Sequence, residues 1–371
     1  MLKARDAVRN LPTYHPPLGG RKGLRLDFNE NTVGCSPRVL ARLRELTGEE
    51  IACYPERTPS EAVVAAHLAV EAGELLLTNG VDEAIHLVCE TFLELGHEAV
   101  IVVPTFAMYE ISAAATGARV IPVPAAENFR FPASDLLAHV TPRTRLIAVA
   151  NPNNPTGAVA DPADLLRVTQ SAPQAAILVD EAYFEFYGKT LVPKWRDLPN
   201  LFVARTFSKA YGMAGLRVGA LMGNAEHIAH VRKVSSPYNV NGIALACLPA
   251  ALADEDYVRD YVRQVRQGRN ELEGVFRRWN IPYWPSEANF VLASFGKLSV
   301  PFIASMRARG ILVRDRSRDH GCQGCVRITL GTREQTARLL TALDESMTEI
   351  GRTGSGAIGA SDARAREGAV R

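Results

Sequence analysis

The sequence has no excess of charge of either sign, no long apolar run and few cysteines. Its 42 Lys and Arg residues balance 40 Asp and Glu residues, which leaves a formal net charge of +2. A near-neutral chain gives no sign of nucleic acid or a membrane surface as a partner, because both attract strongly basic proteins. No apolar run approaches the roughly 18 residues of a membrane-spanning helix, and residues 1–10 lack the apolar segment of a secretory signal. We therefore expect a cytoplasmic protein.

Six cysteines in 371 residues are too few for a disulfide framework and indicate reduced thiols. Two of them, Cys322 and Cys325, form a CxxC pair. A zinc site would need a second pair of ligands, and a thioredoxin-like site would need the pair at the start of a helix. Here the pair stands between a charged loop and the strand-like VRITL. We interpret it as loop packing and expect no metal.

What the sequence does contain is a series of short apolar runs separated by helical patterns. Between residues 74 and 222 these runs are ELLLT, AVIVV, ARVIPV, RLIAVA, AAILVD, LFVART and RVGALM. Continuous apolar runs are typical of strands buried on both faces of a sheet, and helices between them indicate βαβ units. The sequence therefore predicts an α/β fold with a mostly parallel sheet, in which ligands bind beyond the carboxyl ends of the strands.

The pattern changes after this region. A helical stretch over about 241–279 is followed by the strand-like ANFVLAS, ILVRD and VRITL among further helices, which predicts a smaller α+β domain after a connecting helix. We expect residues 1–35 to form an N-terminal arm and part of the small domain, 36–240 the large domain, 241–280 the connecting helix, and 281–351 the rest of the small domain. Residues 352–371 carry hardly any bulky apolar side chain, so we expect a flexible tail.

The strongest local signal is the segment RTFSKAYGMAGLRVG, in which Lys209 follows an apolar strand. A lysine buried at a strand end has a lowered pKa, which favours the nucleophilic amine that forms an imine with a carbonyl cofactor. Ser208 and Arg217 could supply a hydroxyl and a guanidinium to a phosphate. A surface loop with an incidental lysine is the alternative.

Two further strand ends carry polar side chains. Asp180 ends the apolar run in ILVDEAYFEF, with Tyr183 three residues later. A buried carboxylate needs a partner, and the N–H of a protonated pyridine ring is a suitable one; a helix N-cap is the alternative. In LIAVANPNNPTGAV, Asn154 could donate a hydrogen bond to a phenolate oxygen, although the segment could also be merely a turn.

A helix start and an aromatic ring complete the set. In LLTNGVDEAIHLVCETF, the N–H groups around Val81 and Asp82 would point outward from the first turn of a helix, an arrangement that binds phosphate. Asp82 could equally be a first-turn acid that complements the helix dipole. Phe106, in PTFAMYE, follows another strand and could stack on a planar ring, or could be a core residue.

Together these segments resemble the fold-type-I, aspartate-aminotransferase-like superfamily of pyridoxal 5′-phosphate enzymes (class I/II) and, within it, the histidinol-phosphate aminotransferase family. The resemblance runs from about Arg9 to Glu349. Its motifs are VRNLPTYHP, LDFNEN, CYPE, NGVDEAIHLV, PTFAMY, NPNNPTG, VDEAYFEF, RTFSKAYGMAGLRVG, SEANF, GILVRD and GCVRITLGT. NPNNPTG and the lysine segment are specific to the superfamily, whereas CYPE, SEANF and GCVRITLGT, in this order, narrow the match to the family.

The resemblance implies a role for each residue singled out above. Lys209 would form the Schiff base with the cofactor and then move a proton between the substrate carbon and the cofactor. Asp180 would pair with the pyridine nitrogen, and Phe106 would stack on the ring. Tyr183 and Asn154 would contact the ring oxygen.

The cofactor phosphate has its own implied set, which is Ser208, Arg217 and the backbone around Val81 and Asp82. Tyr54, in CYPE, would reach this phosphate from the partner subunit, so the resemblance implies a homodimer.

For the substrates, the resemblance implies that Arg327 receives the carboxylate of glutamate or 2-oxoglutarate. Arg314 and Tyr14 would bind the phosphate of histidinol phosphate; surface ion pairing and packing are their alternatives. Thr32 stands where the family usually has Pro, a departure that we expect to alter a loop near the entrance and that could tune the choice of substrate.

Three other functions stay open at this stage. Aromatic amino acids are alternative substrates for the same reaction, and decarboxylation of threonine phosphate occurs among close relatives. The fold also occurs as the ligand-sensing domain of transcription regulators, but these carry an added DNA-binding module with a basic surface. The matching core begins almost at once in this chain, and its charge is near zero.

Overall fold

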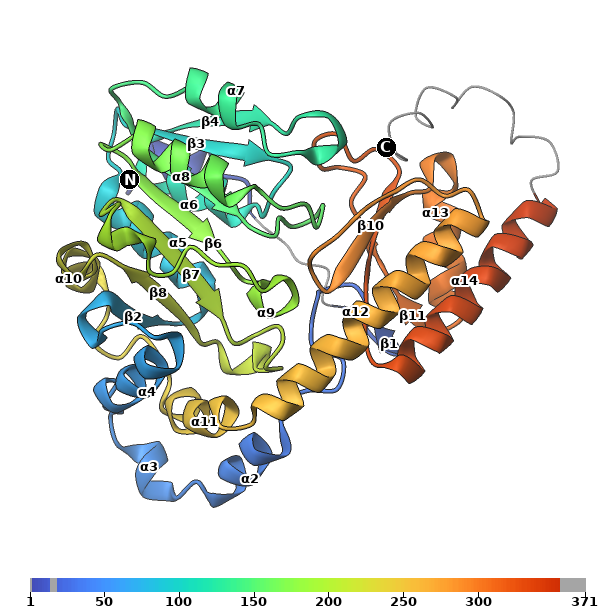
Figure 1. The fold of residues 1–371 in the computed structure, drawn as a ribbon, viewed down its shortest axis with the longest axis horizontal. Coiled ribbons are helices and arrows are strands. Elements are labelled where there is room, and N and C mark those ends of the chain that lie inside the picture. Colours follow the sequence, from blue (N-terminus) through green and yellow to red (C-terminus); the bar gives the residue numbers. More distant parts are fainter. Residues whose placement is uncertain (1, 14–18, 354–371) are drawn as a thin grey trace.

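A computed structural model describes residues 2–13 and 19–353 (Figure 1). Its largest sheet has seven strands in the order β2-β8-β7-β6-β5-β3-β4. They are β2 (Leu75–Thr78), β3 (Glu98–Val103), β4 (Arg119–Pro124), β5 (Thr144–Ala150), β6 (Ala176–Asp180), β7 (Leu201–Thr206) and β8 (Gly219–Gly223). Strand β8 runs antiparallel to both of its neighbours, and the other pairings are parallel. The predicted α/β fold with a mostly parallel sheet is confirmed.

Helices cover both faces of this sheet, which explains why its strands are apolar throughout. Every residue of β2, β6, β7 and β8 is buried. On one face the sheet packs against α5 (Gly80–Phe92), α6 (Met108–Thr116) and α10 (Ala225–Val234). On the other it packs against α7 (Ala133–Ala138) and α8 (Pro162–Ser171), among others. This burial on two sides fixes the sheet as a rigid support for the residues at its strand ends.

The C-terminal part of the chain forms a smaller antiparallel sheet in the order β12-β13-β10-β9. Its strands are β9 (Tyr283–Trp284), β10 (Phe290–Ser294), β12 (Arg314–Asp315) and β13 (Cys325–Thr329), and its helices are α13 (Ser299–Ala308) and α14 (Arg333–Thr353). Near the N-terminus, β1 (Leu24–Arg25) pairs in parallel with β11 (Ile311–Leu312). Figure 1 shows this N-terminal strand beside the C-terminal elements β11 and α14.

The helical stretch expected over 241–279 is two helices, and this part of the prediction is wrong in detail. Helix α11 (Gly242–Leu252) ends before Asp254, whose φ of −111° and ψ of 53° are not helical, and α12 (Glu255–Arg278) follows. The two bury different surfaces. The largely apolar α11 packs against α2 (Pro37–Glu45) and α4 (Thr58–Leu68), whereas α12 packs against α14. Figure 1 shows α12 leading from α11 to the C-terminal elements, where it lies beside α14.

The expected domain boundaries at 35, 240 and 280 stay a prediction. At the C-terminus, α14 continues to Thr353, so the expected tail over 352–371 begins too early by two residues, and the rest of it lies outside the described residues. The remaining helices are α1 (Asp6–Arg9), α3 (Gly48–Ala52) and α9 (Phe184–Tyr187). Among the described residues no helix combines the length and apolarity that crossing a membrane requires.

The CxxC pair packs as interpreted from the sequence. Cys322 and Cys325 are both buried free thiols, and they form a small apolar cluster with Leu292, against which Phe129 and Trp284 pack. The cluster anchors the loop that joins β12 to β13 against the small sheet.

Candidate active site

A cavity of about 300 Å³ lies at the carboxyl ends of strands β5, β6 and β7. The residues that the sequence singled out and that line it are Val81, Asp82, Phe106, Asn154, Asp180, Tyr183, Ser208, Lys209, Arg217, Arg314 and Arg327. Residues that are far apart in sequence therefore face one space. The sheet topology explains this, because neighbouring parallel strands end at the same edge and their loops converge there.

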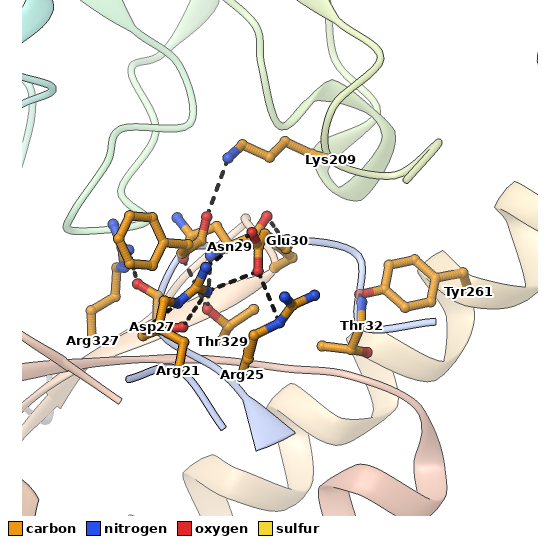
Figure 2. A network of polar contacts seen from close by, with 12 residues as sticks. Arg21, Arg25, Asp27, Asn29, Glu30, Thr32, Lys209, Tyr261, Arg327 and Thr329 are labelled. Carbon is orange, nitrogen blue, oxygen red and sulfur yellow. Dashed lines mark hydrogen bonds and ion pairs between the residues drawn. The ribbon is translucent and has the colours of Figure 1, made fainter. Parts of the chain in front are cut away.

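Lys209 follows the end of β7, and its amine points into this cavity. Nζ lies 3.4 Å from the carbonyl oxygen of Phe28, to which it donates (Figure 2). Burial, followed by the positive charge of Arg327, lowers the pKa of Lys209 to about 8. Roughly a tenth of this lysine is therefore the neutral, nucleophilic amine at pH 7, far more than for a lysine in water.

Asp180 is the last residue of β6 and is almost fully buried. Its Oδ2 accepts a hydrogen bond from the Tyr109 hydroxyl, and its Oδ1 accepts one from the backbone N–H of Ala182 at 2.9 Å. Burial raises the pKa of Asp180 to about 6, against these two hydrogen bonds, which favour the ionised form. The helix N-cap alternative is not realised, because α9 begins at Phe184 and Asp180 caps only the turn before it.

An anion cradle lies at the start of helix α5. Gly80 has a φ of +76°, and a Cβ there would lie 2.5 Å from Nη2 of Arg217, so only glycine allows the guanidinium to approach the helix start. Arg217 also pairs with Asp82 at 2.9 Å. The Ser208 Oγ is buried without a hydrogen-bond partner among the described residues. An orphaned hydroxyl, a guanidinium and outward N–H groups suit a phosphate.

Aromatic and amide side chains surround the space between the lysine and the carboxylate. The Tyr183 hydroxyl accepts a hydrogen bond from Asn29 Nδ2 at 2.9 Å. Phe106 packs edge-on against Tyr109, with ring centroids 6.0 Å apart and an interplanar angle of 89°. These side chains form apolar walls with a few fixed polar groups, as expected for the site of a planar ring.

Arg327, on β13, is the most buried cation of the cavity, with 5% of its surface exposed. It donates to Oδ1 of Asn154 through Nη1 and to the carbonyl oxygen of Asp27 through Nη2, the latter at 2.7 Å. Burial, then Arg316 and Arg314, lower its pKa. Its Nε has no hydrogen-bond partner among the described residues. A buried, incompletely paired guanidinium is suited to a carboxylate ligand.

The cavity also contains residues that the sequence reading did not single out. Tyr109 donates a hydrogen bond to Asp180, and Asn29 donates one to Tyr183. Arg316 lines the cavity together with Arg314 and Arg327. The motifs PTFAMY and LDFNEN contain the first two, but nothing in their local pattern showed what they touch.

Two of the positions singled out from the sequence, Tyr54 and Thr32, do not line this cavity, and a third cannot be placed. Tyr54 is 79% exposed and stacks on Tyr238, with ring centroids 4.4 Å apart. Tyr14 lies outside the described residues. Thr32 contacts Gln335 and, through its N–H, Tyr261 (Figure 2). It lies beside a separate hollow, so the departure from Pro does not touch the cavity wall.

The fold and this set of residues together define the class of enzyme to which the protein belongs. A lysine amine, a buried carboxylate, an apolar slot and a phosphate cradle at the strand ends of this sheet fit pyridoxal 5′-phosphate. The protein is a fold-type-I, pyridoxal-phosphate-dependent aminotransferase.

Comparisons with known proteins give the family. The model of aminotransferase class I and II matches residues 21–343. The chain is 34% identical over 360 residues to the histidinol-phosphate aminotransferase of Moorella thermoacetica, covering 92% of each chain. It is 35% identical over 358 residues to histidinol-phosphate aminotransferase 2 of Methylococcus capsulatus, covering 91% of this chain and 96% of the relative.

A solved structure agrees with these relatives. The crystal structure of histidinol-phosphate aminotransferase from Sinorhizobium meliloti, in complex with pyridoxal-5′-phosphate, matches with a TM-score of 0.85 and 25% identity, covering 94% of this chain and 99% of that one. The chain belongs to the aminotransferase class I and II family and, within it, to the histidinol-phosphate aminotransferases.

Proposed function

We propose that this protein transfers an amino group between histidinol phosphate and 2-oxoglutarate, giving imidazole acetol phosphate and glutamate, a reaction of histidine biosynthesis. The observation that carries the proposal is that two arginines, Arg314 and Arg327, line the same cavity as Lys209 and Asp180. Histidinol phosphate and its product offer these cations a phosphate, and glutamate and 2-oxoglutarate offer them a carboxylate.

The residues of the chain would hold the cofactor in a defined orientation. Ser208, Arg217 and the first turn of α5 would bind its phosphate, and Asp180 would pair with its ring nitrogen. When bound, pyridoxal phosphate acts as an electron sink that stabilises negative charge at the substrate carbon bearing the nitrogen. Tyr109 helps here, because its hydroxyl holds the Asp180 carboxylate in place and favours the ionised form that a protonated ring nitrogen needs.

Lys209 is the group that carries the cofactor and moves the proton. Its lowered pKa lets Nζ accept the proton from the substrate carbon and later return one. Tyr183, held by Asn29, and Asn154, held by Arg327, fix the polar edge of the ring slot. Because these side chains are themselves hydrogen-bonded, the slot is ordered before substrate arrives.

The two acid substrates would share one cavity by using different cations. Arg327 binds the carboxylate of glutamate or 2-oxoglutarate, and Arg314, with Tyr14, binds the phosphate of histidinol phosphate. Replacing Arg314 by alanine removes a charge-assisted hydrogen bond, which is worth about 1.5–3 kcal/mol. We expect kcat/KM for histidinol phosphate to fall by roughly 10- to 200-fold, measured in steady-state assays. An unchanged value would contradict the assignment of the phosphate site.

Separate half-reactions test the proposed function. The holoenzyme is mixed in turn with histidinol phosphate, glutamate, phenylalanine and phosphothreonine, and the change of the cofactor to its amine form is followed by absorbance. Conversion by histidinol phosphate and glutamate, well ahead of phenylalanine, is the expected result. Preference for phenylalanine would favour an aromatic aminotransferase, and carbon dioxide from phosphothreonine without a keto product would favour a decarboxylase.

We also propose a cytoplasmic homodimer in which Tyr54 enters the partner's site. Supporting it is a group of apolar side chains, each exposed by more than a third, on or beside helices α2, α3, α4 and α11, which pack against one another. They are Leu40, Ile51, Tyr54, Val63, Tyr238 and Ile243. Exposed apolar side chains gathered on neighbouring helices are typical of an interface between subunits, and the six free cysteines suit a reducing compartment.

Mixed dimers test whether Tyr54 acts across the interface. One subunit carries Tyr54→Phe and the other Lys209→Ala, with different affinity tags. If Tyr54 enters the partner's site, one of the two sites in the mixed dimer has both an intact lysine and an intact tyrosine. We then expect up to half of the wild-type activity, although the Lys209→Ala homodimer is inactive and the Tyr54→Phe homodimer is weakened by roughly tenfold through loss of one hydrogen bond to phosphate. Activity no higher than half that of the Tyr54→Phe homodimer would contradict the arrangement.

A further inference from the structure

Three arginines project from one face of the hairpin formed by β12 and β13. The register of this antiparallel pair places Arg314 directly opposite Arg327. Arg316 lies two residues beyond Arg314, and its N–H donates to the carbonyl oxygen of Cys325 at 2.9 Å, which continues the ladder. Because side chains alternate along a strand, Arg316 shares the face of Arg314. All three line the cavity.

This arrangement is electrostatically unfavourable unless an anion lies between the cations. Like charges directly opposite each other destabilise a sheet, and most of the surface of these side chains is removed from water. The acids nearby are already engaged. Glu30 pairs with Arg21 at 2.9 Å, and Asp319 pairs with Arg316. The cavity therefore keeps more positive charge at this end than its own acids balance.

Arg316 itself is mostly buried, with 14% of its side chain exposed, yet its Nε has no hydrogen-bond partner among the described residues. Asp319, on the same loop, holds only one end of the guanidinium. Arg314 lies over the ring of Phe28, with its guanidinium carbon 5.1 Å from the centroid. The face thus presents two neighbouring guanidinium groups to the cavity, with Arg327 deeper.

We propose that Arg316 is a substrate-binding residue that, with Arg314, binds the phosphate of a phosphorylated amine, and that Asp319 pairs with its guanidinium when no phosphate is bound. The proposal rests on the proposed function and deepens it. A phosphate monoester carries a charge of about −1.5 to −2 at neutral pH and three acceptor oxygens, so one guanidinium neither neutralises it nor saturates its oxygens. A carboxylate has one charge and is matched by a single arginine. Arg316 is therefore the residue that favours phosphate over carboxylate.

A purely structural ion pair is the competing explanation, and the two differ in what Asp319 does. If Arg316 only anchors the loop, removing either partner has the same effect. If Arg316 binds phosphate, Asp319 competes with the ligand for the guanidinium. Asp319→Asn then strengthens phosphate binding, whereas Arg316→Gln weakens it.

The test compares the holoenzyme with the Arg316→Gln, Asp319→Asn and Arg318→Gln variants. Arg318 is the exposed neighbour on the same loop and is the matched control. Half-reaction rates are measured with histidinol phosphate, with histidinol and with glutamate. We expect Arg316→Gln to lower kcat/KM for histidinol phosphate by roughly 10- to 200-fold. The corresponding loss for histidinol and for glutamate should be smaller by a factor of at least about ten. Arg318→Gln should match the wild type with all three.

A second readout does not depend on histidinol phosphate. Because phosphate and glutamate would share one cavity, inorganic phosphate is titrated as an inhibitor of the glutamate half-reaction. The inhibition constant is expected to rise in Arg316→Gln and to fall in Asp319→Asn. Equal losses with all three substrates in Arg316→Gln, a parallel loss in Asp319→Asn, or no inhibition by phosphate would each overturn the inference. If the wild type converts histidinol phosphate and Arg316→Gln does not discriminate, only this inference fails. If the wild type does not convert histidinol phosphate, the proposed function fails, and the inhibition constants still decide the role of Arg316.

Discussion

Replacing Lys209 by alanine is expected to lower the rate of amino transfer by about 10⁴-fold or more, because in the proposed mechanism both the covalent link to the cofactor and the proton transfer depend on this one amine. Lys209 lines the cavity, and the pKa of its amine, about 8, suits both tasks. The variant should still bind pyridoxal phosphate, because Ser208, Arg217 and Asp180 remain. The cofactor spectrum of the variant should match that of free pyridoxal phosphate.

Lys297→Ala, at an exposed lysine of the small sheet region, is the control and should keep wild-type turnover. A small primary amine added to Lys209→Ala should restore part of the rate, since it can enter the space that the side chain leaves. Full turnover of Lys209→Ala without added amine would refute the catalytic assignment.

Replacing Asp180 by asparagine is expected to separate activity from stability. Breaking a buried ion pair costs about 3–5 kcal/mol, so loss of the pairing with the protonated ring nitrogen should lower kcat by on the order of 1000-fold. In the absence of cofactor, by contrast, the substitution is expected to stabilise the protein. Folding raises the pKa of Asp180 from 3.8 to about 6, so the ionised carboxylate destabilises the apoenzyme. Stability is lost as the pH rises from about 4 to about 6, and above pH 6 the cost is roughly 3 kcal/mol.

The measurement is chemical unfolding of the apoenzyme at pH 5 and pH 8, together with kcat of the holoenzyme. Asp180→Asn should be at least as stable as the wild type at pH 8, with a smaller advantage at pH 5. A variant that is inactive and also much less stable at pH 8 would show that Asp180 holds the fold together and is not reserved for the cofactor.

Much of the site was predictable because its parts are local. Lys209, Asp180 and Asn154 each stand in a short motif at the end of an apolar run, and parallel strands that end at one edge bring such motifs together. The seven strands were recognisable for the same reason, since burial on two faces makes each of them apolar throughout.

The rest depends on pairings between distant segments. That Tyr109 holds Asp180, or Asn29 holds Tyr183, follows from how helix α6 and the N-terminal segment dock, which no local pattern records. Arg314 lies opposite Arg327 because of the register between β12 and β13. The length and packing of the intervening loop decide that register. The break at Asp254 was missed because both helices that flank it have helical patterns and only tertiary packing separates them.

The pairing of β1 with β11 has a consequence for how the enzyme is made. Residues 24–29 find their partners about 300 positions later, as in the hydrogen bonds of Arg327 with Asp27 and of Thr329 with Asn29. On the ribosome, the large sheet can collapse while the first strand still waits, because loops of this length close only after the last strands have emerged. Nascent chains that stop short of β13 should therefore contain a folded large sheet but an incomplete active site. The enzyme should become active only when its synthesis is complete.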